Sequence, residues 1–147
     1  MGAQPYWYFT EYDLDVDAAL QSLRRREFDA GRYNPVLRFI KFPIDSASPS
    51  PRAQHSSIEQ AREAAGADGT RSILDIESVG EIPDFGTAAP IDQTTLVDLY
   101  DTTQPTREML ESDPALFDHV ERGEARYVIV YQDGQPNELL FLGYSYD

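Results

Sequence analysis

Cationic residues that could clamp an anion are concentrated in one short segment of this sequence. From Arg24 to Lys41 there are six cations and two acids, a net charge of +4, so the other 129 residues carry −18 of the total charge of −14. Guanidinium groups form paired hydrogen bonds that suit phosphate and carboxylate. We therefore consider Arg32, Tyr33 and Arg38 as a candidate anion clamp. The alternative is that these cations complement a helix end and form ion pairs with the acidic remainder of the chain.

Four acids, Glu11, Asp13, Asp15 and Asp17, alternate where a predicted strand meets a predicted helix. Carboxylates at this spacing could converge on a hard cation such as Ca²⁺. The EF-hand pattern, however, also requires a central glycine and a glutamate at the twelfth position of its loop, and neither is in place here. Acids at a helix start also complement the helix dipole. We therefore expect a charged helix start, with no metal and no cofactor.

Tyrosines mark three predicted strands and form the second candidate binding surface. Seven of the nine tyrosines lie in these strands: Tyr6, Tyr8, Tyr12, Tyr127, Tyr131, Tyr144 and Tyr146. Side chains alternate along a strand, and the predicted hairpin register places Tyr127, Tyr131, Tyr144 and Tyr146 on one face. Tyrosine offers a broad contact area with a polar tip, and beside carboxylates it attracts arginine and lysine. The alternative is that tyrosine occurs in these strands only because it favours β-structure, and that the rings pack beneath helices.

No recognisable catalytic motif is present in the sequence. The absence of cysteine excludes disulfides, thiolate metal sites and thiol nucleophiles. The sequence also lacks a Gly-x-Ser-x-Gly elbow, an HExxH motif, a P-loop and a dinucleotide fingerprint. The two histidines, His55 and His119, fall in a predicted loop and on a predicted helix, which is a poor basis for a zinc site. Whether the protein is an enzyme stays open at this point.

The acidic composition narrows the range of partners. A net charge of −14 repels nucleic acid and anionic membranes and favours a basic protein surface. Solubility alone is the simplest alternative reason for such a charge. No apolar run approaches the roughly 18 residues of a membrane span, and the N-terminus shows no secretory signal. We therefore predict a cytoplasmic protein whose partners include neither nucleic acid nor membrane.

The first half of the chain is predicted to contain a strand over Tyr6–Tyr12 and a helix over Val16–Ala30. Asp15 is a good N-cap for this helix, and Gly31 can end it in the left-handed conformation. The segment from Val36 to Phe42 alternates like a second strand.

A Ser- and Pro-rich stretch at about 43–57 follows and is predicted to be a mobile loop within a single domain, 1–147. A short helix is expected over 58–65, with Ser56 and Glu59 as a capping box. Residues 70–79 fit a helix and a strand equally, and residues 80–95 are expected to be mostly loop.

The C-terminal third is predicted to contain two helices and a β-hairpin. The helices cover 105–112 and a segment that begins at Asp113-Pro114 and ends at Gly123. The hairpin pairs 126–132 with 135–146 around Asp133-Gly134, with Pro136 opposite Tyr131. The expected fold is a single α+β domain with an antiparallel sheet, built from the N-terminal strand and this hairpin, and with helices packed mainly on one face.

Two functional hypotheses follow. The first is a non-enzymatic protein-binding module, such as an inhibitor, an immunity-type protein or an adaptor, that recognises a basic protein surface. The alternative is a small enzyme or ligand-binding domain that holds an anionic metabolite with Arg32, Tyr33 and Arg38. A homo-oligomer is also compatible with the sequence if the C-terminal strand is an exposed edge.

Overall fold

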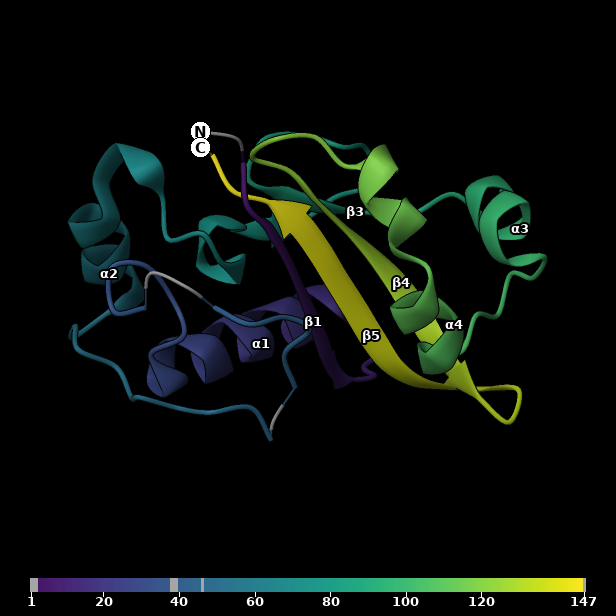
Figure 1. Ribbon diagram of the computed structural model, residues 1–147, viewed down its shortest axis with the longest axis horizontal. Coiled ribbons are helices and arrows are strands. Elements are labelled where there is room, and N and C mark those ends of the chain that lie inside the picture. The colour runs from purple at the N-terminus through teal and green to yellow at the C-terminus, as the bar shows by residue number, and fades with distance from the viewer. Residues whose placement is uncertain (1–2, 38–39, 46, 147) are drawn as a thin grey trace.

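The computed structural model describes residues 3–37, 40–45 and 47–146. Its centre is one five-stranded sheet with the strand order β1-β5-β4-β3-β2 (Figure 1). The strands are β1 (Pro5–Glu11), β2 (Ser78–Val79), β3 (Thr87–Pro90), β4 (Ala125–Gln132) and β5 (Gln135–Tyr144). The helices are α1 (Val16–Ala30), α2 (Ile58–Ala65), α3 (Gln93–Tyr100) and α4 (Arg107–Ser112), with short 3-10 turns η1 (Gly66–Asp68), η2 (Ile73–Asp75) and η3 (Pro114–His119). The fold is α+β, as predicted.

The sheet is mixed, so the prediction of an antiparallel sheet is wrong for two strands. β1, β5 and β4 pair antiparallel, as the N-terminal strand and the hairpin suggested. β3 pairs parallel to β4, and β2 pairs parallel to β3. The long connection that contains α3, α4 and η3 lets the chain return to the starting end of the sheet, as parallel pairing requires. β5 is paired on both sides, with β1 and β4, and is therefore not the edge strand that suggested a homo-oligomer.

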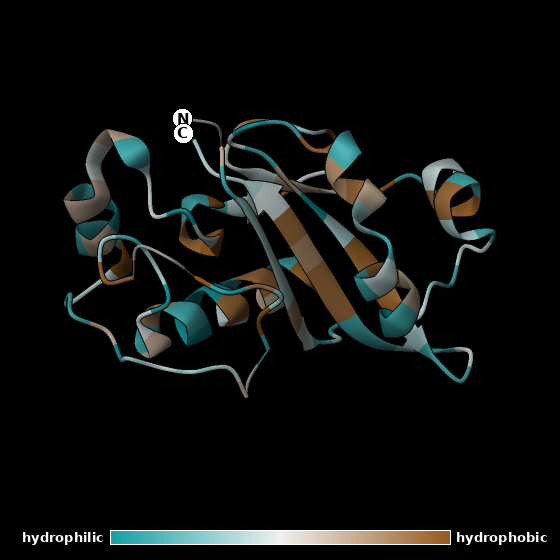
Figure 2. Cartoon of the chain, in the orientation of Figure 1, coloured by the Kyte–Doolittle hydropathy of each residue, from teal (hydrophilic) through white to brown (hydrophobic). Residues whose placement is uncertain are grey.

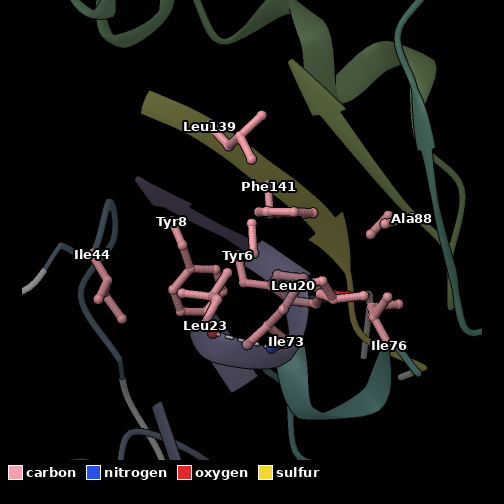
Figure 3. Packing of buried hydrophobic residues seen from close by; sticks show 12 residues of the cluster. Tyr6, Tyr8, Leu20, Leu23, Ile44, Ile73, Ile76, Ala88, Leu139 and Phe141 are labelled. Carbon is pink, nitrogen blue, oxygen red and sulfur yellow. Dashed lines mark hydrogen bonds between the residues drawn. The ribbon is translucent and has the colours of Figure 1, made fainter. Parts of the chain in front are cut away.

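Helices contact both faces of the sheet, so packing mainly on one face is not confirmed. One face meets α1, through Tyr6, Tyr8, Leu139 and Phe141 of the sheet and Leu20 and Leu23 of the helix (Figure 3). The other face packs against α3, α4 and η3, through Phe9, Val128 and Leu140 of the sheet and Leu96, Leu110 and Leu116 of the helices. Figure 2 shows that the middle of β5 is apolar whereas its first residues are hydrophilic. The core therefore lies in two layers, and the start of β5 extends beyond it.

The helix α1 has the bounds and caps that its sequence predicted. The Asp15 side chain accepts a hydrogen bond from the backbone N–H of Ala18 at 3.1 Å. Gly31 ends the helix with a φ of 74°, and its N–H donates to the carbonyl of Phe28 at 3.0 Å. This left-handed C-cap turns the chain sharply after the helix. A Cβ atom on Gly31 would lie 2.1 Å from the carbonyl oxygen of Arg52, so the following loop rests directly on the cap.

We expect Gly31→Ala to lower the free energy of unfolding by about 2 kcal/mol or more, since it adds left-handed strain to a backbone clash. Urea denaturation measures this loss. Gly134→Ala is the matched control, because Gly134 has a φ of 76° and, apart from its chain neighbours, no residue has an atom within 4 Å of an added Cβ. Equal losses in the two variants would contradict close packing of the Arg52 backbone on the end of α1.

The C-terminal hairpin forms around the predicted turn but contains a β-bulge. Asp133 and Gly134 have φ values of 53° and 76°, as a type I′ turn requires, and Tyr131 lies opposite Pro136. Beyond this pair the register shifts, so that Val130 pairs with Glu138 and leaves Asn137 as the extra residue. A shift of one residue moves every following side chain of one strand to the other face.

The bulge separates tyrosines that were predicted to share a face. Tyr127 pairs with Phe141 and packs on the side of α1. Tyr144 packs in the opposite cluster, with its ring edge-on to Phe117 at a centroid distance of 5.6 Å. The predicted common face of the four C-terminal tyrosines is therefore not formed.

Several local expectations also differ from the structure. The side chain that caps α2 is that of Ser57, which accepts from the N–H of Gln60 at 3.1 Å, and not that of Ser56. In the predicted strand from Val36 to Phe42, the described residues belong to no strand. Residues 70–79 contain both the turn η2 and the short strand β2, and α3 was not foreseen.

The segment at 43–57 contains no helix or extended strand among its described residues, and one β-bridge joins Ile44 to Tyr8. Of the helices in the described part of the chain, none combines the length and apolar character needed to cross a bilayer.

Candidate functional site

The predicted anion clamp is occupied by the protein itself. Arg32 is only 4 % exposed, and its Nε and Nη2 donate to the carboxylate of Glu27 at 2.7 and 2.6 Å. Its Nη1 donates to the carbonyls of Ser48 at 2.9 Å and Pro49 at 3.2 Å. The hydrogen bonds to Glu27 raise the pKa of Arg32. The guanidinium therefore fastens the end of α1 to the loop that follows.

The other members of the clamp do not supply a free surface. Tyr33 is fully buried, and its hydroxyl lies 2.7 Å from Nδ1 of His55. The Tyr33 hydroxyl also accepts from the N–H of Gln54 at 3.5 Å. Arg38 lies outside the described residues. Within the part that is described, Arg32 and Tyr33 thus act as structural contacts of the loop at 43–57.

The sheet tyrosines are placed in separate environments. Tyr146 stacks on Phe85 at a centroid distance of 4.8 Å, beyond the end of β5. Tyr127 and Tyr131 are among the lining residues of a pocket of about 210 Å³, together with apolar side chains such as Leu96 of α3. These residues do not form one recognition surface.

Carboxylates gather in a pocket where β1 ends and β5 begins. This pocket, called here the acidic pocket, has a volume of about 440 Å³ and is lined by Phe9, Thr10, Glu11, Arg26, Asp45, Asn137 and Glu138. Glu11 and Glu138 are direct neighbours across the antiparallel pair of β1 and β5. Asp45 reaches the pocket because Ile44 forms a bridge beside β1 and donates its N–H to the carbonyl of Trp7 at 3.1 Å.

The carboxylates of the acidic pocket have different electrostatic environments. Like charges directly across a strand pair repel each other. Burial raises the pKa of Glu138, although Arg107 acts in the opposite direction. The pKa of Asp45 is lowered, first by a hydrogen bond from the N–H of Ala47 and then by Arg107.

One guanidinium of the protein already sits against this pocket. Arg107 donates to Asp45 at 3.0 Å and to Glu138 at 3.2 Å, and it also pairs with Glu111. Its Cζ lies 4.1 Å from the centre of the Phe9 ring, a cation–π contact. The carboxylates and the ring are therefore arranged in a way that suits a guanidinium.

The arginine that lines the pocket, Arg26, forms no ion pair with these acids in the described structure, although its charge helps to lower the pKa of Asp45. The Nε of Arg26 donates to Glu27 at 2.8 Å, and its Nη1 donates to the carbonyl of Phe9 at 3.2 Å. The buried Nη2 of Arg26 has no hydrogen-bond partner among the described residues. The ion pair of Arg26 is therefore directed to the core, and Glu11 forms no ion pair within the described part of the chain.

The segment after β1 adds an exposed apolar side chain. Leu14 is 86 % exposed and lies between two acids, Asp13 and Asp15. Asp13 accepts from the N–H of Asp15 at 2.9 Å, and Asp15 caps α1, so these carboxylates also order the turn. Among the described residues, no three acidic or histidine side chains are grouped so that they could hold a metal ion.

A second pocket, of about 360 Å³, lies between α1, α2 and the C-terminal segment. Arg24, Arg62, Asp75 and Tyr146 are among its lining residues. Asp75 is 2 % exposed, and its carboxylate accepts from the N–H of Thr70 at 3.0 Å and from the Thr70 hydroxyl at 2.9 Å. Burial raises the pKa of Asp75, and the hydrogen bonds from Thr70 oppose this shift only in part.

The raised pKa of Asp75 predicts a pH dependence of stability. A carboxyl whose folded pKa exceeds its unfolded pKa stabilises the fold fully at low pH, and that contribution is lost as pH rises through the folded pKa. The free energy of unfolding of the wild type should therefore fall relative to that of Asp75→Asn between about pH 4 and about pH 7. Urea denaturation of both proteins across this range measures the difference. If the wild type instead became more stable relative to Asp75→Asn as the pH rises, the Thr70 hydrogen bonds would outweigh the effect of burial on the pKa of Asp75.

The acidic pocket was not predicted from the sequence. Of its lining residues, only Glu11 was considered, as one of four alternating acids that were interpreted as a charged helix start. Asp45, Glu138 and Arg107 carry no local signal and meet only through the fold. Comparisons with protein-family models, curated proteins and solved structures find no match to this chain.

Proposed function

We propose that this protein is a non-enzymatic binding module that recognises a basic protein surface through the acidic pocket. The observation that carries this proposal is the convergence of Glu11, Asp45 and Glu138 on one concavity of about 440 Å³. Arg107 bridges two of these carboxylates and leaves Glu11 without an ion pair in the described structure. A cationic side chain of a partner would relieve the repulsion between Glu11 and Glu138.

Arginine is the side chain of a partner that the pocket suits best. The contact of Arg107 with Phe9, Asp45 and Glu138 is an internal example of guanidinium recognition by an aromatic ring and carboxylates. Lysine carries the same charge but lacks the planar fork that pairs with carboxylates. We therefore expect the partner to present arginine rather than lysine.

Leu14 supplies the apolar part of the proposed interface. Interfaces combine an apolar anchor with a polar rim that excludes water. Leu14, flanked by Asp13 and Asp15, has this combination in the segment that directly follows Glu11. The net charge of −14 would also accelerate the encounter with a basic partner. Inhibitors, immunity-type proteins and adaptors can all act through such a surface.

The alternative hypothesis, an anionic metabolite held by Arg32, Tyr33 and Arg38, has less support. Both Arg32 and Tyr33 are buried and already have partners. A ligand at this position would have to displace the ion pair with Glu27.

Fluorescence anisotropy with synthetic peptides tests the proposed function. The probes are a labelled peptide that alternates arginine and alanine around one leucine (the arginine peptide) and its lysine counterpart. We expect the arginine peptide to bind more tightly than the lysine peptide, and its affinity to fall at least tenfold between about 50 mM and about 500 mM salt. Equal affinities for the two peptides, or binding that ignores salt, would contradict arginine recognition by carboxylates.

A further inference from the structure

The pocket between α1, α2 and Tyr146 is lined by different residues from the acidic pocket. Two guanidinium groups line it, that of Arg24 from α1 and that of Arg62 from α2. Their positive charges are close enough that Arg62 contributes to the lowered pKa of Arg24, after burial. Two cations that face one concavity are a usual arrangement for binding an oxyanion.

Arg24 forms no ion pair in the described structure. Its Nη1 donates to the side-chain oxygen of Gln21 at 2.9 Å, and its Nη2 donates to the carbonyl of Leu74 at 3.2 Å. Both acceptors are neutral, no carboxylate among the described residues pairs with Arg24, and its buried Nε has no hydrogen-bond partner there. Burial and the charge of Arg62 lower the pKa of Arg24 by more than the nearby acids Glu77, Glu59 and Asp75 raise it. An anion in direct contact with Arg24 would therefore stabilise its charge.

The other side of the pocket is held in place by a chain of contacts. Arg62 donates from Nη1 to Glu77 at 2.6 Å and from Nη2 to the Tyr146 hydroxyl at 3.3 Å. That hydroxyl donates in turn to the backbone carbonyl of Asp75 at 3.3 Å. The Tyr146 ring is fixed between Phe85, which stacks on it, and Gly69, whose added Cβ would lie 2.6 Å from the ring. The position of Arg62 is thus set before any ligand arrives.

We propose that this pocket binds a small oxyanion, the carboxylate or phosphate group of a metabolite, between Arg24 and Arg62. Three acids also line the pocket: Glu59 and Glu63 of α2, which are exposed, and the buried Asp75, whose carboxylate accepts hydrogen bonds from Thr70. Their charge would repel an extended polyanion more strongly than a single small group held between the arginines. This site is independent of the proposed protein-binding function, because no residue lines both pockets.

Thermal denaturation with simple anions tests the proposal. The melting temperature is measured in phosphate and in acetate, each against chloride at equal ionic strength, so that the two arms separate a phosphate site from a carboxylate site. At ten times the dissociation constant, a specific anion should raise the melting temperature by about 3 °C. No rise with either anion would overturn the proposal.

Three variants test whether the rise in melting temperature comes from anion binding in this pocket. Arg24→Gln and Arg62→Gln should each lose the rise, whereas Arg25→Gln should keep it, because Arg25 is an exposed neighbour that pairs with Asp29. An equal loss in Arg25→Gln would assign the rise to general charge effects and refute the site.

A fourth variant is expected to strengthen anion binding, so a loss of protein stability cannot explain its result. Glu59→Gln removes a negative charge from the pocket lining and should strengthen binding of the same anion, which shows as a larger rise at subsaturating concentration. A smaller rise in Glu59→Gln would contradict an anion bound beside Arg24.

Discussion

Replacement of Arg32 by methionine should lower the free energy of unfolding by about 3–5 kcal/mol. Glu27 is fully buried and accepts hydrogen bonds from Arg32 at 2.7 and 2.6 Å and from Arg26 at 2.8 Å. Removal of Arg32 would leave this carboxylate in the core with one partner, and would also free the carbonyls of Ser48 and Pro49. Urea denaturation at neutral pH provides the measurement.

Arg25→Met is the matched control for this variant. Arg25 lies on the same helix and pairs with Asp29 at 3.3 Å, but both side chains are more than half exposed. Such a pair contributes at most about 1 kcal/mol. If Arg32→Met cost no more than Arg25→Met, the guanidinium of Arg32 would be available to a ligand, and the anion clamp predicted from the sequence would regain support.

The double variant Glu11→Gln/Asp45→Asn should weaken binding of the arginine peptide at least tenfold, or about 1.4 kcal/mol. It removes two of the three carboxylates of the acidic pocket and leaves Glu138 with Arg107. The loss of the Asp45–Arg107 pair should have little effect on stability, because both side chains are about one-third exposed. Fluorescence anisotropy provides the affinity, and thermal denaturation confirms that the variant is folded.

Asp98→Asn/Asp118→Asn is the control for overall charge. Both residues are exposed, lie on α3 and η3, and do not line the acidic pocket. This variant carries the same net charge as the pocket variant and should keep the wild-type affinity. A similar loss in both double variants would mean that net charge, rather than the pocket, attracts the peptide.

The sequence predicted the elements whose signals are local. Asp15 and Gly31 stand at the two ends of α1 because a side-chain cap and a left-handed residue are chemical requirements of those positions. Asp133-Gly134 likewise predicts its turn, because both residues must adopt positive φ.

Longer-range features could not be predicted in the same way. The bulge at Asn137 changes the face of every later residue of β5, and nothing in the local sequence marks it. β3 is a short segment of Thr, Ala and Pro whose parallel pairing depends on the path of the chain through α3 and α4.

The candidate site could not be predicted from the sequence for a similar reason. The composition around Arg32 could not distinguish an internal ion pair from a ligand contact, because both need a guanidinium beside an acid. Glu11, Asp45, Arg107 and Glu138 come from four separate segments. The pairing of β1 with β5, the bridge of Ile44 to β1 and the packing of α4 bring them together.

An NMR titration of the isotopically labelled protein with the arginine peptide tests the proposed function most directly. The backbone amide signals report which residues contact the peptide. We predict that the largest shifts occur at Glu11, Leu14, Asp45, Asn137 and Glu138, and that the signals of Arg62 and Tyr146 move little. Largest shifts around Arg62 and Tyr146, or small shifts spread over the whole acidic surface, would contradict recognition of a basic partner by the acidic pocket.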